Sequence, residues 1–137
     1  MKLLLDTHAL VWWWTDDPRL PAAARAAIAA PATTVLVSAA SVWEIATKHR
    51  LGKWAEVAPL LDGFETLVRR SRFTPLPVTL GQARAAGSLP GPHRDPFDRM
   101  LIAQAADQQT PLVSGDPVFA SYGIAVIWQT PDAHAAP

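Results

Sequence analysis

The stretch Lys2–Asp6 reads KLLLD, a continuous apolar run that ends in a carboxylate. Runs of this kind are typical of the central strands of a parallel sheet, which are buried on both faces. Three later segments have the same character, and a fourth carries two prolines that favour an edge strand or an extended linker. The three are Thr33–Val37, Pro111–Ser114 and Ile124–Trp128, and the fourth is Phe73–Val78.

Helical patterns alternate with these segments. Their ends are marked by capping residues, by prolines suited to a first turn and by glycines after the last apolar position. The predicted helices cover residues 7–14, 18–30, 41–50, 56–72, 80–88 and 95–108. This alternation predicts an α/β fold, a three-layer α/β/α sandwich around a mainly parallel sheet of four or five strands. We expect one domain over 1–129 and a flexible tail over 130–137.

The composition excludes several classes of protein. The chain of 137 residues has no cysteine, which rules out disulfides, thiolate metal sites and thiol nucleophiles, and its four scattered histidines disfavour a zinc site. Its formal net charge is zero, which argues against strong non-specific binding to nucleic acid. No segment has the pattern of a signal peptide or a membrane span, so we expect a cytoplasmic protein without a membrane partner.

Four acidic residues occupy places that a parallel sheet brings together. Asp6 ends the first strand, and Asp116 follows by two residues the strand that ends at Ser114. Glu44 and Asp98 lie in the first turns of two predicted helices. Sites in such sheets form beyond the carboxyl ends of the strands. Because carboxylate oxygens suit Mg²⁺ and Mn²⁺, these acids predict a metal site that activates water for attack on a phosphodiester.

Helix capping is the alternative interpretation for three of these acids. The segments SVWE, DPFD and DP at 41–44, 95–98 and 116–117 all have the pattern of a cap followed by a first turn. Asp95 is best explained as a cap, whereas the other acids fit both roles. Asp6 has no such explanation in the sequence, because an acid at the end of a buried strand is costly unless something pairs with it.

Four segments resemble the acidic blocks of the PIN-domain superfamily. They are LLLDTHALVWW, SAASVWEIA, HRDPFDRMLIAQA and LVSGDPVF, and in order and spacing they are most similar to VapC-type toxins of bacterial toxin–antitoxin pairs. The resemblance extends from Lys2 to Trp128. It matches the acids of the family to Asp6, Glu44, Asp98 and Asp116, and a family hydroxyl to Ser114.

The resemblance implies a metal-dependent endoribonuclease that uses Mg²⁺ or Mn²⁺ and leaves a 5′-phosphate and a 3′-hydroxyl. It also implies a cognate antitoxin and a homodimer. Residues expected around the metal ligands or at the substrate are Thr7, His8, Asp95 and Ser114, although His8 stands where the family usually has Ser or Asn. Basic residues expected to contact RNA phosphates are Lys48, Arg50, Arg94 and Arg99.

Two other functions remain open at this point. One is an aspartyl-phosphate enzyme or receiver-like domain with Asp6 as nucleophile, although the sequence DTH lacks the second aspartate of such phosphatases. The other is a catalytically silent domain that binds RNA or protein. Four clustered carboxylates argue against it, because a module that only binds gains nothing from mutually repelling charges.

Three consecutive tryptophans, Trp12–Trp14, follow the first strand. Successive residues of a helix are about 100° apart, so the three indoles cannot all face one core. We expect them to pack in the core and at an interface, in preference to stacking on nucleobases. Trp43, next to Glu44, is predicted to be a core residue.

Overall fold

Five parallel strands form a single sheet in the computed structural model, which describes residues 1–129. The strand order is β3-β2-β1-β4-β5. The strands are β1 (Lys2–Leu5), β2 (Thr34–Ser38), β3 (Thr74–Leu76), β4 (Leu112–Val113) and β5 (Val126–Ile127). The predicted α/β class and parallel sheet are therefore confirmed, including the proline-containing segment as the edge strand β3. The predicted tail, 130–137, lies outside the described residues.

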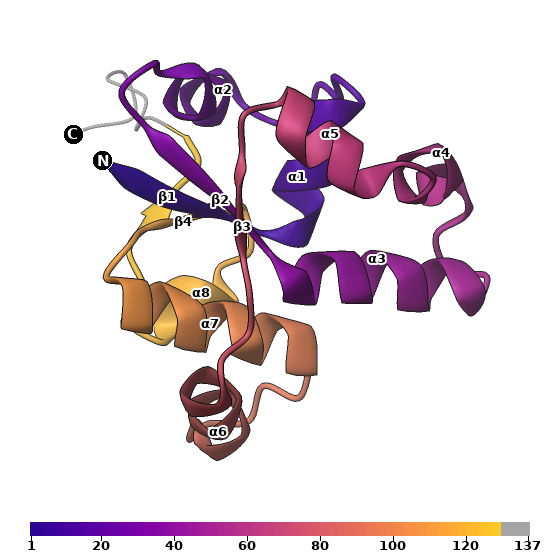
Figure 1. Cartoon of the computed structure of the whole chain (residues 1–137). Coiled ribbons are helices and arrows are strands. Elements are labelled where there is room, and N and C mark those ends of the chain that lie inside the picture. Colours follow the sequence, from indigo (N-terminus) through magenta and orange to yellow (C-terminus); the bar gives the residue numbers. More distant parts are fainter. Residues whose placement is uncertain (130–137) are drawn as a thin grey trace.

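Helices cover both faces of this sheet. The helices α1, α2 and α5 lie on one face, and α7 and α8 lie on the other (Figure 1). Their bounds are α1 (Thr7–Trp14), α2 (Ala22–Ala29), α3 (Ala39–Arg50), α4 (Ala58–Leu61), α5 (Phe64–Arg70), α6 (Leu80–Ser88), α7 (Pro96–Gln108) and α8 (Val118–Ser121), with a short 3-10 turn, η1, over Ala55–Val57. Within residues 1–129, none of these helices is both long and apolar enough to cross a membrane.

The central strand β1 is buried on both faces, as its sequence predicts. Leu3 and Leu5 belong to the core cluster under α1, α2 and α5, whereas Leu4 belongs to the cluster under α7 and α8. All three leucines are at most 1% exposed. In the register of the sheet, Leu5 pairs with Val113 of β4, and the Asp6 N–H donates to the Val113 carbonyl at 3.0 Å. The carboxyl ends of β1 and β4 are therefore level with each other.

Two predicted helices differ from the structure. The segment 56–72 is broken into η1, α4 and α5, because Gly63 adopts the left-handed conformation at φ 91° and the chain turns there. The helix predicted over 18–30 begins only at Ala22. Its expected first residue, Pro18, lies instead in a turn in which the Leu20 N–H donates to the Asp17 carbonyl.

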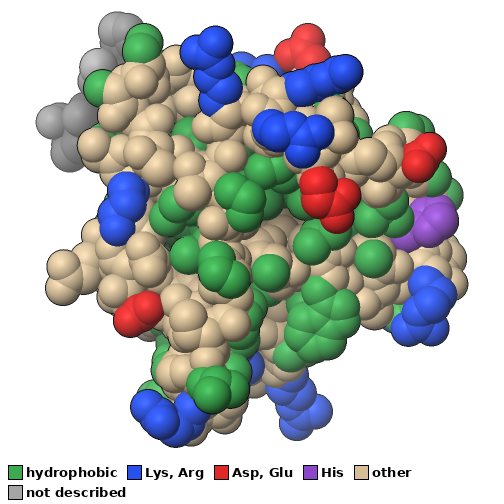
Figure 2. All heavy atoms as spheres, in the orientation of Figure 1, with side chains coloured by type: hydrophobic (Ala, Val, Ile, Leu, Met, Phe, Trp, Pro, Cys, Tyr) green, Lys and Arg blue, Asp and Glu red, His purple; other side chains and the backbone are tan. Residues whose placement is uncertain are grey.

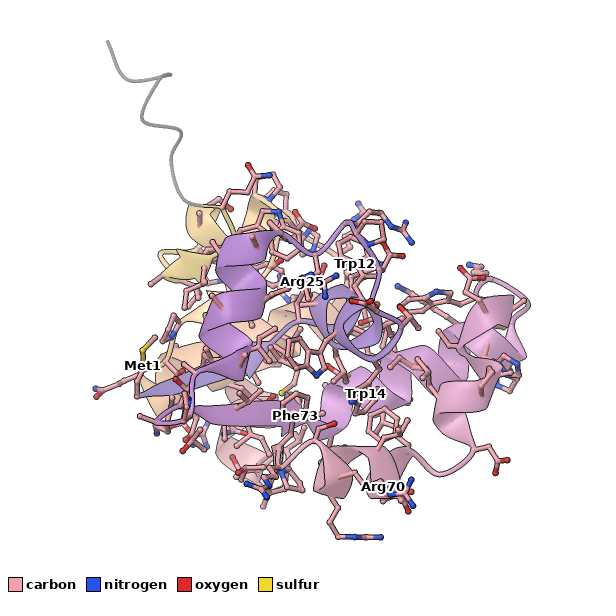
Figure 3. The ribbon with its side chains drawn as sticks, turned by 90° about the horizontal axis from the view of Figure 1, so that it is seen from above. Met1, Trp12, Trp14, Arg25, Arg70 and Phe73 are labelled. Carbon is pink, nitrogen blue, oxygen red and sulfur yellow. The ribbon has the colours of Figure 1, made fainter. Side chains whose placement is uncertain are left out.

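The tryptophans of α1 lie on different sides of the helix and have different neighbours, as the helical period requires. Trp14 packs edge-on against Phe64 at a centroid distance of 5.1 Å and donates its indole N–H to Ser71 at 2.8 Å. Trp12 lies on the other side of the helix (Figure 3). The prediction for Trp43 is wrong: it is 61% exposed, and its ring packs edge-on against that of Phe97.

A buried amide joins three elements beneath the sheet. Gln104 of α7 is completely buried and accepts a hydrogen bond from the hydroxyl of Ser38 at the end of β2. Its amide nitrogen donates to Gln82 of α6 at 3.1 Å and to the Pro77 carbonyl at 3.3 Å. These bonds fix α7, and with it the start of the helix that carries Asp98, against the sheet.

Replacing this amide should destabilise the fold. Gln104→Leu leaves the Ser38 hydroxyl and the Gln82 amide without their buried partner, which costs about 1–3 kcal/mol. Gln108→Leu, one turn later on the same helix, removes only an exposed bond to Lys2 and should change stability by less than about 0.5 kcal/mol. Urea unfolding of both variants measures the difference. Equal midpoints would show that the buried network does not hold α7 in place.

Candidate functional site

Asp6 is the more deeply buried of the two acids that lie at strand ends, Asp6 and Asp116. It is 7% exposed, directly after β1. Its pKa is raised to about 7, chiefly by burial; hydrogen bonds from Ser114 and from the Ala9 N–H lower the pKa, and the negative charges of Asp98 and Glu44 raise it. The Ala9 bond, at 2.7 Å, makes Asp6 the N-cap of α1, a role that the sequence analysis did not assign to it.

Ser114 connects Asp6 to Asp116. The Ser114 side chain is fully buried, donates to the Asp6 carboxylate and accepts from the Asp116 N–H at 3.0 Å. Asp116 is exposed and lines the same cavity as Asp6. Its carboxylate accepts from the Val118 N–H at 3.0 Å, so it also supports the start of the short helix α8. The two strand-end acids thus meet at one edge of the sheet.

Glu44 is buried but does not lie in the first turn of its helix. The cap of α3 is Ser38, which accepts from the Ala40 N–H, so the predicted capping box at Ser41 is wrong. Ser41 instead accepts a hydrogen bond from the Thr7 hydroxyl at 3.1 Å, which ties α1 to α3. The Glu44 carboxylate forms an ion pair with Lys48, one turn later. It faces Asp6 closely enough to raise the pKa of that residue.

Asp98 opens α7 as predicted, and Asp95 is its N-cap. The Asp95 carboxylate accepts from the N–H groups of Phe97 and Asp98 at 2.9 and 3.1 Å. Asp98 contacts the His93 ring at 2.8 Å. Burial raises the pKa of Asp98, the bond to His93 opposes this, and the charges of Asp95 and Glu44 raise it further.

Asp6 therefore interacts electrostatically with Glu44 and Asp98 and shares a cavity with Asp116, but the four acids are not arranged as metal ligands. Among residues 1–129, no three acidic or histidine side chains converge closely enough to hold a metal ion. Glu44 and Asp98 turn to cationic or hydrogen-bonding partners of the chain itself, Lys48 and His93. The donor set nevertheless fits a hard divalent ion, because it offers carboxylate oxygens around a desolvated acid whose pKa is raised by its neighbours.

The predicted phosphate contacts have different surroundings. Arg99 donates to the backbone carbonyls of Ala86, Leu89 and His93, so it holds the loop between α6 and α7 and does not serve as a free phosphate ligand. Lys48 is paired with Glu44. Its partial burial lowers its pKa, but the hydrogen bond to Glu44 and the charges of Asp95 and Asp98 outweigh burial and raise it.

Arg50 and Arg94 remain available for a phosphate. Both are exposed, and neither takes part in an ion pair within the described part of the chain.

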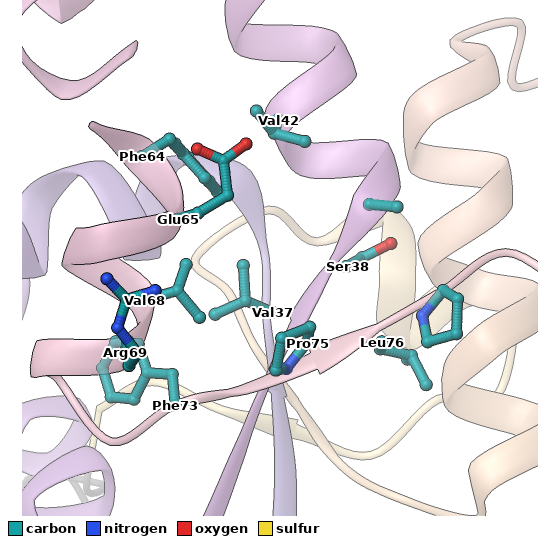
Figure 4. A pocket seen from close by; sticks show the side chains of 12 residues that line it. Val37, Ser38, Val42, Phe64, Glu65, Val68, Arg69, Phe73, Pro75 and Leu76 are labelled. Carbon is teal, nitrogen blue, oxygen red and sulfur yellow. The ribbon is translucent and has the colours of Figure 1, made fainter. Parts of the chain in front are cut away.

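A second, larger cavity lies away from the acids, between β3 and α5. It has a volume of about 570 Å³, and apolar side chains such as Val42, Phe64 and Leu76 line it (Figure 4). Figure 2 shows apolar side chains gathered around a hollow on this face of the molecule. None of the four predicted acids borders it, so this cavity is not the candidate catalytic site although it is the larger of the two.

A protein-family model for the PIN domain matches residues 3–125, which is most of the chain and includes all four acids. The chain belongs to the PIN domain family. This membership favours a PIN-type site over the receiver-like alternative with Asp6 as nucleophile. No curated protein matches this PIN domain.

Several solved structures share the PIN fold of this chain. VapBC2 from Rickettsia felis, bound to a DNA fragment from its promoter, matches with a TM-score of 0.68 at 16% identity, covering 94% of this chain and 100% of the other. FitAB bound to a DNA fragment gives 0.64 at 20% identity, covering 96% and 99%. FitAcB from Neisseria gonorrhoeae gives 0.54 at 19% identity, covering 90% and 95%.

Three residues at this PIN site escaped the sequence analysis. Arg19 and Trp128 line the cavity that holds Asp6 and Asp116, and His93 contacts Asp98. Trp128 directly follows β5, so the rule that placed Asp6 and Asp116 at strand ends also applies to it. Arg19 and His93 lie in loops, and nothing in their local sequence distinguishes them from other surface residues.

The raised pKa of Asp6 predicts a specific dependence of stability on pH in the metal-free protein. Its carboxyl titrates near 3.8 when unfolded and near 7 when folded, so between these values the folded state binds more protons. The free energy of unfolding should therefore decrease as pH rises from 4 to 7, by at most ~4 kcal/mol from this group. Asp6→Asn keeps a capping oxygen and should lack this component.

Chemical denaturation of wild type and Asp6→Asn in EDTA, at several pH values, tests this dependence. The variant should be the more stable of the two at pH 8, and their difference should shrink toward pH 4. Stability curves that run parallel over this range would show that Asp6 titrates normally and is not destabilised by its neighbours.

Proposed function

We propose that this PIN domain, over residues 1–129, is a metal-dependent endoribonuclease and the toxin of a toxin–antitoxin pair. One observation carries the proposal: the buried Asp6 carboxylate interacts electrostatically with Glu44 and Asp98 and shares a cavity with Asp116. The four acids would hold Mg²⁺ or Mn²⁺. A divalent ion bound there lowers the pKa of water and offsets charge on the scissile phosphate.

The residues around the acids have supporting roles in this proposal. Ser114 orients Asp6 and Asp116 through its two hydrogen bonds, and Thr7 orients α1 against the helix that carries Glu44. Lys48, which pairs with Glu44, would contact the RNA backbone if Glu44 held a metal ion instead. Arg50 and Arg94 add positive charge at the rim.

The proposed protein partners are suggested by the structures that share this fold. VapBC2, FitAB and FitAcB are the fold neighbours, and we propose a cognate antitoxin and a homodimer for this chain as well. The exposed Trp43, which packs on the partly buried Phe97, supports the dimer, because large aromatic side chains are enriched at protein interfaces. A cytoplasmic location fits a chain whose substrate is cellular RNA.

Metal removal tests the activity directly. EDTA should abolish cleavage of total RNA, and Mg²⁺ or Mn²⁺ should restore it with 5′-phosphate and 3′-hydroxyl ends. Asp6→Asn should lose about 10³-fold in rate, because removing one element of charge stabilisation in an active site costs this much. Asp62→Asn makes the same change at an exposed position and should be fully active. Cleavage that survives EDTA and leaves 2′,3′-cyclic ends would refute the proposal.

Substitutions of the neighbours Asp95 and Asp98 should have different effects, because Asp95 caps α7 and Asp98 is a proposed metal ligand. Asp95→Ser keeps a capping oxygen for α7 and should retain most activity and stability. Asp98→Asn should lose at least about 10²-fold in rate with the fold intact, because it removes a charge from the proposed metal site. Rate measurements and thermal melts on both variants decide between these roles. An inactive, folded Asp95→Ser would place Asp95 among the residues that act on the metal.

A further inference from the structure

The cavity beside the strand-end acids has an aromatic wall as well as an acidic one. Its volume is about 450 Å³, within the usual range for small-ligand sites. Asp6 and Asp116 line one part, and His8, Trp12 and Trp128 line another. The larger cavity between β3 and α5 is lined by no tryptophan or histidine and by none of the four predicted acids.

The aromatic wall is a continuous row of rings. The His8 and Trp12 ring centroids are 5.6 Å apart, and those of Trp12 and Trp128 are 5.9 Å apart. Both indoles are only partly buried and pack against the core cluster under α1, α2 and α5. They are therefore held in place on one side and accessible on the other, as a stacking platform requires.

The backbone at Gly115 is shaped around Trp128. A Cβ at residue 115 would lie 2.6 Å from Cε2 and 2.8 Å from Nε1 of the Trp128 indole, closer than real side chains approach. Just before it, the Ser114 N–H donates to the Ile127 carbonyl and joins the ends of β4 and β5. The Trp128 ring therefore lies against the short segment between Ser114 and Asp116, within the cavity that both acids share.

The positively charged side chain of Arg19 lies at the edge of this aromatic wall. The Arg19 guanidinium lies 4.7 Å from the centre of the Trp12 ring. Two bonds to Asp17, at 3.0 and 2.8 Å, use its Nε and Nη2 and orient the group, while its side chain remains 66% exposed. An oriented, accessible guanidinium stacked on an indole suits contact with a phosphate or a nucleobase.

We propose that this cavity is a nucleobase subsite of the RNA-binding surface, in which one unpaired base packs against Trp128 and Trp12 while Arg19 contacts the adjoining phosphate. The inference rests on the proposed ribonuclease function and deepens it. Aromatic rings beside a phosphate-directed site favour single-stranded RNA, whose bases can be unstacked from their neighbours and packed on a protein ring. A base held here fixes the position of the next phosphate relative to Asp6 and Asp116.

Binding without cleavage tests this subsite. The probes are a fluorescein-labelled hexa-adenylate and a labelled abasic ribose-phosphate hexamer of the same charge, titrated in EDTA and followed by anisotropy. Wild type should bind the hexa-adenylate more tightly. Trp128→Leu should weaken that binding between about 5-fold and 150-fold and leave the abasic probe unchanged, as expected for loss of one stacking contact.

Two matched changes control the measurement. Arg19→Gln should weaken the binding of both probes, whereas Arg70→Gln removes an exposed arginine on α5, away from Trp12 (Figure 3), and should affect neither. Trp128→Phe keeps a ring and should retain most of the preference for bases. Because the assay requires no cleavage, its result stands even if the protein proves inactive as a nuclease.

A second measurement needs no variant of uncertain fold. In ¹⁵N-labelled wild type, hexa-adenylate should shift the indole N–H signals of Trp12 and Trp128, and that of Trp14, which is bonded to Ser71 on the other side of α1, should not respond. The proposal is overturned if wild type does not distinguish the two probes, or if a folded Trp128→Leu distinguishes them as well as wild type does. The proposal is also overturned if the indole signals of Trp12 and Trp128 do not shift with hexa-adenylate. The aromatic wall would then serve in packing or in binding a protein partner.

Discussion

Asp6 places a carboxylate at the end of a strand that is buried on both faces, where water cannot solvate its charge. Its backbone position is fixed by the sheet, since its N–H is bonded to β4 and its carboxylate caps α1. The charge therefore cannot move away from Glu44 and Asp98, which raise its pKa. A fold that keeps like charges together in this way is destabilised by them, unless protons or cations compensate.

The chain supplies part of that compensation from its own side chains. Lys48 pairs with Glu44 and is also attracted by Asp95 and Asp98, so one ammonium is shared among three acids. His93 takes a similar place beside Asp98, and the Ser114 hydroxyl beside Asp6. These contacts turn the carboxylates of Glu44 and Asp98 toward partners within the chain. They also place exchangeable cationic groups where a divalent ion would compete.

The parts of the site that follow from strand order could be predicted from the sequence, whereas contacts between distant side chains could not. KLLLD identified a strand buried on both faces, and the strand-end rule then located Asp6 and Asp116. The cap at Asp95 followed from local chemistry alone. Glu44 was placed correctly near the acids but for the wrong reason, since α3 starts earlier than the apparent capping box.

The errors have a common physical cause. Arg99 looks like a surface cation in the sequence, but its guanidinium fits three carbonyls of a loop whose path depends on how α6 and α7 pack. Trp43 is a large aromatic residue of the kind that usually lies in a core, yet the packing of α3 leaves it exposed beside Phe97. In both cases tertiary packing, which local periodicity does not encode, decides the environment of the side chain.

The central claim is that these four carboxylates form a cation site, and Mn²⁺ binding tests it most directly. The electron paramagnetic resonance signal of free Mn²⁺ disappears on binding, so titration of the metal-free protein reports affinity without any assumption about substrate. The account predicts saturable binding to wild type and to Asp62→Asn, and a loss of at least about tenfold in affinity for Asp6→Asn and Asp116→Asn. Equal Mn²⁺ affinity for wild type and Asp6→Asn would contradict it.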